Sequence, residues 1–291
     1  TEYANYFLSN FFISVAFSSI TFTCMTIVYY RILNNAEFRS LQICKIIAIN
    51  GITSILDFYT FIIAINLSSF PNIDGYFIFM NDNNLLVVIA FFMFYATGMQ
   101  VTSTMLISIN RLISLLKAGK INEALFFKVV WVLIIVPPPI TIIPMFFGNC
   151  YYRKEISQDG QNYYVPTLDQ MELLAPFTFY VVIVGIISNF SNTLLTYQFA
   201  KLRREKTHSR KFVKVAKVEQ GLFTSIICTS FLQLSILIIV LATSLFKVYS
   251  LAPSLSIFIS LYTGSQFWLT VLFVPSVRRF IIPNLQMIRR L

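Results

Sequence analysis

Charged residues are scarce in this sequence of 291 residues. Asp, Glu, Lys and Arg together make up 12% of the chain, whereas 57% of the residues are hydrophobic and 16% are aromatic. A soluble globular domain carries roughly 25% charged residues, so this chain has too little charge to cover itself with a water-facing surface. The mean hydropathy of +0.73 agrees with that conclusion. The composition therefore predicts an integral membrane protein.

Groups that carry enzymatic chemistry are also scarce. The chain has one histidine, His208, and it lies within a strongly basic run. There is no Gly-rich phosphate loop and no set of paired carboxylates, and the four cysteines lack the spacing of metal ligands. We therefore predict that the protein is not an enzyme and has no metal site and no cofactor.

Long apolar segments recur seven times along the chain. Each has 21 residues or more, which is enough at about 1.5 Å per residue to cross a hydrocarbon core of about 30 Å. The linkers between them are short, so we expect one domain over residues 1–291, an all-α bundle of seven transmembrane helices. The predicted spans are about 6–30, 43–66, 85–110, 127–147, 173–199, 219–245 and 253–275.

The positions of Lys and Arg predict the orientation of the bundle. With the N-terminus outside, all but three of the 22 basic residues fall on the cytoplasmic side, and the exceptions are Arg153, Lys154 and Lys247. This is the distribution that the positive-inside rule describes. We therefore expect the C-terminus in the cytoplasm, and we attribute the net charge of +10 to topology and to anionic membrane lipid rather than to nucleic acid. The chain begins with Thr1 instead of Met, so we expect it to start inside a longer sequence.

The third segment carries polar residues on one face. Residues 85–109 contain no Lys, Arg, Asp, Glu, His or Pro, which favours an uninterrupted helix. A helix with lipid on all sides would not present a polar stripe, so we expect this helix at the centre of the bundle. The same period continues outward through Leu86, Ala90 and Met93, which with Thr97 either line an outer ligand cavity or form an apolar core layer. The polar residues of the stripe are Thr97, Gln100, Thr104, Ser108 and Arg111.

Asp57 is the one acid in the interior of a predicted span. It shares a face of the second segment with Asn50 and Ser54, at spacings of four and three residues. Ionisable groups inside a membrane are costly and point to function. Asp57 is therefore expected to look into the bundle, either protonated and hydrogen-bonded, or binding a cation with hydroxyls of neighbouring helices, or making a neutral structural hydrogen bond.

Two short motifs extend this interpretation. The third segment ends in STMLISINRLISLL, with Asn110-Arg111 near the inner membrane boundary, and FVPSVRRFI at 273–281 follows the seventh. Seven helices with such a pair at the end of helix 3 resemble a G-protein-coupled receptor of the rhodopsin-like type. The motifs are most similar to the nematode serpentine chemoreceptors, namely the Srg superfamily and its Srv-like group. The resemblance covers essentially the whole chain.

The resemblance implies a function in sensory signal transduction. It implies a chemoreceptor of the plasma membrane, with the sensory cilium as an alternative location, that binds a small molecule or peptide outside and activates a heterotrimeric G protein inside. Arg111 is then expected to contact the G protein, although an Arg that reaches the headgroups from a helix end is common. The basic run 201–217 also has an alternative role as an anchor at phospholipid headgroups. The residues expected to face the G protein are Asn110, Arg111, Arg203, Arg204, Lys214 and Lys217.

The chain also departs from the receptor pattern. Asn110 replaces the acid that usually precedes the Arg, and the seventh segment has Pro275 but no Asn-Pro-x-x-Tyr. Residues 81–84 are Asn-Asp-Asn-Asn, so Cys150 lacks the usual cysteine partner near the top of helix 3. A glycosylation sequon begins at Asn66, close to the predicted membrane edge. Two other functional classes stay open, a seven-span transporter or channel subunit and a non-signalling membrane scaffold.

Overall fold

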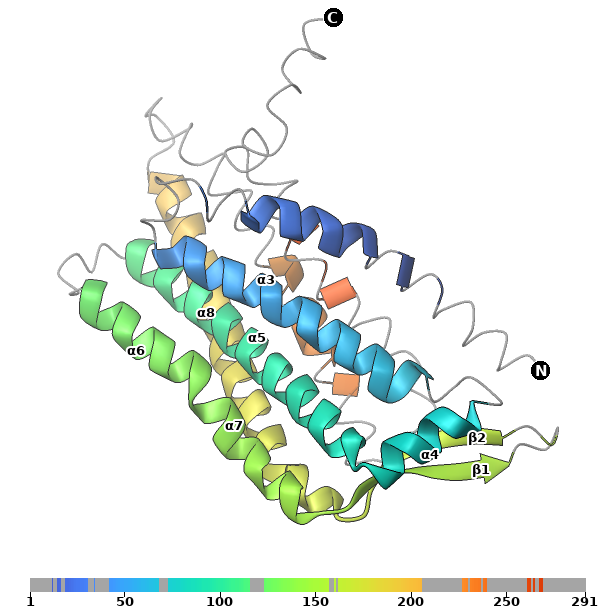
Figure 1. Cartoon of the computed structure of the whole chain (residues 1–291). Helices are drawn as coiled ribbons and strands as arrows, with labels where there is room; N and C mark the ends of the chain where they lie inside the picture. Colours follow the sequence, from blue (N-terminus) through green and yellow to red (C-terminus); the bar gives the residue numbers. More distant parts are fainter. Residues whose placement is uncertain are drawn as a thin grey trace, which may run out of the picture.

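The computed structural model is mostly helical (Figure 1). It describes residues 12, 15–16, 19–30, 34, 42–67, 73–115, 123–156, 160, 162–205, 227–229, 231–236, 238–239, 261–262, 264 and 267–268, and at some of these only the backbone. Within that part, three helices are long and apolar enough to cross a membrane: Leu85–Asn110, Lys128–Phe147 and Glu172–Gln198. The structure confirms a mostly helical chain with three candidate membrane spans, and the bundle of seven spans stays a prediction.

A long helix, α5 (Leu85–Leu115), lies at the centre of the described helices. Helix α3 (Gln42–Phe61) continues through a π-helical turn, Ile62–Asn66, and lies along α5 (Figure 1). Helix α8 (Ala175–Glu205) packs against α5 as well. The central position of α5 follows from its sequence, because it combines apolar residues on most faces with small and polar residues that neighbouring helices bury.

The fourth predicted span is a helix interrupted by prolines. It consists of α6 (Glu123–Ile135), α7 (Pro137–Ile142) and the 3₁₀ turn η3 (Ile143–Phe147). The break falls at Val136, directly before three consecutive prolines, which lack the N–H groups that would continue the hydrogen bonds of α6. Pro138 fits closely against α5, since a Cβ atom on Gly98 would lie only 2.8 Å from the Cβ of Pro138.

A β-hairpin covers one end of the helices (Figure 1). Its antiparallel strands are β1 (Cys150–Ile156) and β2 (Asn162–Leu168), with Tyr152 opposite Pro166. The short helix α4 (Asp74–Asp82) lies beside it, and the 3₁₀ turn η4 (Met171–Leu174) leads from β2 into α8. The sequence analysis places this hairpin in an outer segment but predicts no strands there.

The two faces of the hairpin differ in polarity. Side chains of a strand alternate between faces, so Tyr152 and Tyr164, which are both buried, point to the same side, toward the helices. Arg153 and Glu155 lie on the opposite face, are exposed, and pair with each other. The hairpin therefore buries Tyr152 and Tyr164 on one face and exposes the charged pair Arg153 and Glu155 on the other, as an antiparallel pair at a surface does.

Candidate functional site

The polar faces of α3 and α5 meet in the interior. Thr97 Oγ1 lies 2.7 Å from Asp57 Oδ1, and Gln100 Nε2 donates a hydrogen bond to Ser54 Oγ at 2.9 Å. Asp57 is 5% exposed, and Ser54 and Gln100 are each 1% exposed. These contacts join two helices at the centre of the bundle. We call the following five residues the polar seam: Ser54, Asp57, Thr97, Gln100 and Thr104.

The polar seam continues toward the C-terminal end of α5. Thr104 Oγ1 lies 3.3 Å from the Tyr262 hydroxyl, which links α5 to a segment far along the chain. Ser108 is buried and donates to the backbone oxygen of Thr104 at 3.0 Å. Asn50 is buried as well, and its backbone oxygen accepts a 2.7 Å hydrogen bond from Ser54. The structure thus brings the intramembrane polar candidates together.

The four residues proposed for a ligand pocket have different surroundings. Leu86 is 2% exposed and packs in a cluster with Tyr152 and Tyr164 of the hairpin. Ala90 is also buried, in a second cluster with residues of α7, η3 and α8. Met93 packs against the first cluster, and Thr97 belongs to the polar seam. Leu86 and Ala90 therefore form a filled apolar layer in this arrangement, which corresponds to the core alternative for these positions.

Most residues expected to face the G protein lie beyond the described side chains. Asn110 is half-buried near the C-terminal end of α5. Arg111 follows it in the same helix, and Arg203 and Arg204 lie in the last turns of α8, but for these three only the backbone is described. Lys214 and Lys217 lie outside the described residues. The placement of Asn110 and Arg111 shows that α5 continues unbroken through this pair to Leu115.

One asparagine fastens the hairpin to α4. Asn81 Nδ2 donates to the backbone oxygen of Tyr152 at 2.9 Å, and the Tyr152 N–H donates to Asn81 Oδ1 at 2.8 Å. The Asn81 amide therefore pairs with both backbone groups of Tyr152, as a neighbouring strand would. The backbone N–H and carbonyl of Tyr152 therefore point away from β2, and Tyr152 and Pro166 face each other without hydrogen bonds between the strands. Proline is tolerated at such a position because it has no N–H to donate.

The Tyr152 side chain reaches the end of α3. Its hydroxyl lies 3.0 Å from the backbone oxygen of Ala64 and 3.3 Å from that of Ile63, both in the π-helical turn. Carbonyls at a helix end lack partners within the helix, so this hydroxyl satisfies a group that is otherwise left open. Phe77 of α4 packs edge-on against the Tyr152 ring and stacks on Tyr164, at centroid distances of 4.7 and 4.4 Å. The hairpin is thus joined to α3 and α4 through one aromatic cluster.

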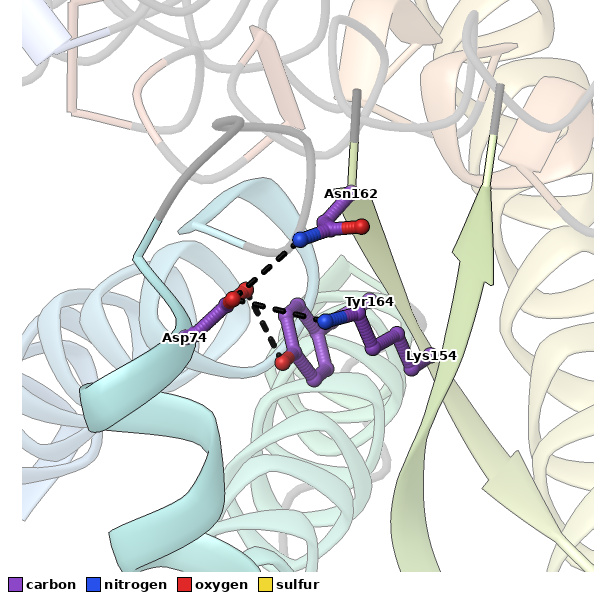
Figure 2. Close-up of polar contacts among 4 residues, drawn as sticks. All are labelled: Asp74, Lys154, Asn162 and Tyr164. Carbon is purple, nitrogen blue, oxygen red and sulfur yellow. Dashed lines mark hydrogen bonds and ion pairs between the residues drawn. The ribbon is translucent and has the colours of Figure 1, made fainter. Parts of the chain in front are cut away.

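Asp74, the first residue of α4, holds the other end of the hairpin (Figure 2). The Tyr164 hydroxyl donates to it at 3.0 Å, Asn162 Nδ2 at 3.2 Å and Lys154 Nζ at 3.4 Å. The hydrogen bond from Tyr164, together with Lys154 and Asn162, lowers the pKa of Asp74 below its usual value. Asp74 is therefore a carboxylate at neutral pH, and it binds residues from both strands.

Cys150 does not form a disulfide with any described cysteine. Burial and the negative charge of Asp169 raise the pKa of its thiol, so the thiol is protonated at neutral pH. The anchors described above hold the hairpin without a covalent link. The sequon residue Asn66 ends the π-helical turn beside this region, but its side chain is not described.

Comparisons with known proteins do not assign the chain. No protein-family model matches it, and no curated protein matches it in sequence. Within the described part of the chain, no three His, Cys, Asp or Glu residues gather where a metal ion would bind. Sequence reasoning also missed the anchoring roles of Asn81, Tyr152 and Asp74. The tyrosines of 150–156 and 162–168, a residue type that favours strands, are the signal for the hairpin.

Proposed function

We propose that this protein is a seven-helix chemosensory receptor of the nematode serpentine type, which binds a small ligand outside the cell and activates a heterotrimeric G protein. The observation that supports this proposal best is the course of α5. It runs for 31 residues from the hairpin-covered end through the Asn110-Arg111 pair to Leu115, and the polar seam lies between the hairpin and this pair. A helix of that length spans about 46 Å, so it connects two aqueous surfaces.

The membrane topology belongs to the same proposal. The three long apolar helices fit three of the seven spans, and α3 with its π-helical turn has the length for a fourth. With the N-terminus outside, the hairpin lies on the extracellular face and the basic run 201–217 in the cytoplasm. Helix α5 then extends from the ligand side to the G-protein side.

Ligand binding in this proposal requires the hairpin to move. Tyr152 and Tyr164 cover Leu86, so a molecule from the aqueous phase reaches the outer part of α5 only after these side chains shift. A ligand that binds the opened arrangement more tightly shifts the population toward it. Because Tyr152 also bonds the end of α3, the shift releases α3 as well, and the change reaches the polar seam.

The test is signalling by variants of Arg111. The receptor is screened against small organic molecules in cells that express a promiscuous G protein, with surface expression measured in parallel. Arg111→Ala is expected to abolish the evoked response while surface expression persists, and Arg111→Lys, which keeps the charge, to retain part of it. A full response from Arg111→Ala would refute the assigned role.

A flux assay and the ligand screen together separate the other classes of function. Ion or solute flux through the purified protein in vesicles without a G protein would favour a transporter or channel subunit. Absence of any response across the screen, with normal surface expression, would favour a membrane scaffold.

A further inference from the structure

Four hydroxyl groups between the packed helices share one hydrogen-bonding pattern, in which each can donate to the backbone of its own helix. Ser54, Thr97, Thr102 and Thr104 each lie 2.7–2.9 Å from the backbone oxygen four residues earlier in their own helix. A hydroxyl has a single hydrogen, so a hydroxyl that donates to its own helix must accept any further hydrogen bond. Each of these four also contacts a side chain on another helix, and that side chain must then be the donor.

Three of the four partner side chains are hydrogen-bond donors. Ser54 accepts from the amide Nε2 of Gln100, a group that only donates. Thr102 contacts the Tyr180 hydroxyl, and Thr104 contacts the Tyr262 hydroxyl at 3.3 Å. Phenol hydroxyls donate readily, so all three contacts fit this pattern.

The fourth partner is a carboxyl group. Thr97 Oγ1 lies 2.9 Å from the Met93 backbone oxygen and 2.7 Å from Asp57 Oδ1. If Asp57 were ionised, three oxygen atoms would share one hydrogen, and one of the two short contacts would be repulsive. We propose that Asp57 is a proton-binding site, a neutral carboxylic acid whose O–H donates to Thr97 and so joins α3 to α5.

The surroundings of Asp57 support the neutral form. The side chain is 5% exposed, and neither ion pair among the described residues includes it. An unpaired buried carboxylate is strongly unfavourable, and the group then takes up a proton. Thr97 lies 12 residues inside the outer end of α5, about 18 Å along the helix and far from either surface.

No charged neighbour in the described segments replaces the proton. Helix α5, residues 19–30 and the described residues of 261–268 pack on this side of α3, and they contain no Asp, Glu, His, Lys or Arg at this depth. Their titratable side chains there are thiol and phenol groups, with no carboxylate or amine among them: Cys24, Tyr29, Tyr95 and Tyr262. Lys45 of α3 is 12 residues away, again about 18 Å.

The proton therefore stabilises one arrangement of α3 and α5. Loss of the proton leaves a carboxylate against Thr97, which must turn its hydroxyl away from Met93 or separate from Asp57. Unfolded protein exposes Asp57 to water, where a carboxyl group ionises near pH ~3.9. The folded protein thus binds one more proton than the unfolded protein at higher pH, and its stability falls as the pH rises.

The experiment measures thermal unfolding in nanodiscs from about pH 5 to about pH 9. The wild-type folded-to-unfolded ratio is expected to fall as the pH rises, by up to about tenfold per pH unit. Asp57→Asn keeps a donor for Thr97 and cannot ionise, so its stability should match that of the wild type at low pH and depend less on pH. An equal pH dependence in wild type and Asp57→Asn would overturn the proposal.

Infrared spectroscopy gives a second readout that does not depend on stability. The wild type is expected to show the carbonyl band of a protonated carboxylic acid. Thr97→Val retains Asp57 but removes its acceptor, and should shift this band to higher frequency, whereas Thr97→Ser should leave it in place. Absence of the band from folded wild type at neutral pH would overturn the proposal, even if Asp57→Asn does not fold.

Discussion

Asn81→Ala should loosen the hairpin. The substitution removes two hydrogen bonds of 2.8 and 2.9 Å and leaves the N–H and the carbonyl of Tyr152 without their partner. A net value of about 1 kcal/mol for each bond predicts a loss of about 2 kcal/mol. At about 1.4 kcal/mol per factor of ten, this corresponds to an open population of the hairpin that is about 30-fold larger.

Hydrogen–deuterium exchange of the folded protein measures that opening. Amides of β1 and β2 should exchange faster in Asn81→Ala, whereas amides in the middle of α5 should not change. Asn83→Ala is the matched control, because Asn83 Nδ2 donates only within its own turn, to the exposed backbone oxygen of Phe79. Equal protection of the hairpin amides in both variants would refute the role of Asn81 in fastening the hairpin to α4.

Further predictions concern packing, pH and the aromatic anchor. Gly98→Ala should lower the thermal unfolding temperature because its Cβ would approach Pro138 to 2.8 Å, whereas Gly75→Ala, with no atom within 4 Å of the new Cβ, should not destabilise the protein through a clash. Hairpin protection in exchange experiments should persist at neutral pH and decrease as the pH falls below about 3.8, since the lowered pKa of Asp74 makes its carboxylate stabilising above that range, and Asp74→Asn should remove this dependence. Tyr152→Phe should increase exchange at the end of α3 by about fivefold, from the loss of about 1 kcal/mol, and unchanged exchange there would show that its hydroxyl contributes nothing.

The sequence predicts the interior of the bundle better than its outer end. The polar faces on residues 50–57 and 97–108 follow from helical periodicity alone, and the structure places them against each other. Periodicity works here because a membrane helix satisfies its backbone internally, so the side chains on each face reveal its neighbours.

The outer end depends on contacts between distant parts of the chain. Asn81 and Tyr152 are 71 residues apart, and Asp74 and Tyr164 are 90 apart. Nothing in the local sequence of 81–84 indicates that one of its asparagines pairs with a strand. Leu86 is a similar case. The helical spacing of residues 86–97 allows either a ligand cavity or a core layer at this position, and only the contact of Leu86 with the hairpin decides between the two.

The central claim is that α5 connects an extracellular hairpin to a cytoplasmic basic run. Single cysteines introduced as Glu155→Cys on the exposed face of β1 and as Lys214→Cys in the basic run test it with a membrane-impermeant thiol reagent on intact cells, against the wild type as background. The account predicts labelling at residue 155 before permeabilisation and at residue 214 only afterwards. Labelling of both residues from the same side of the membrane would contradict it.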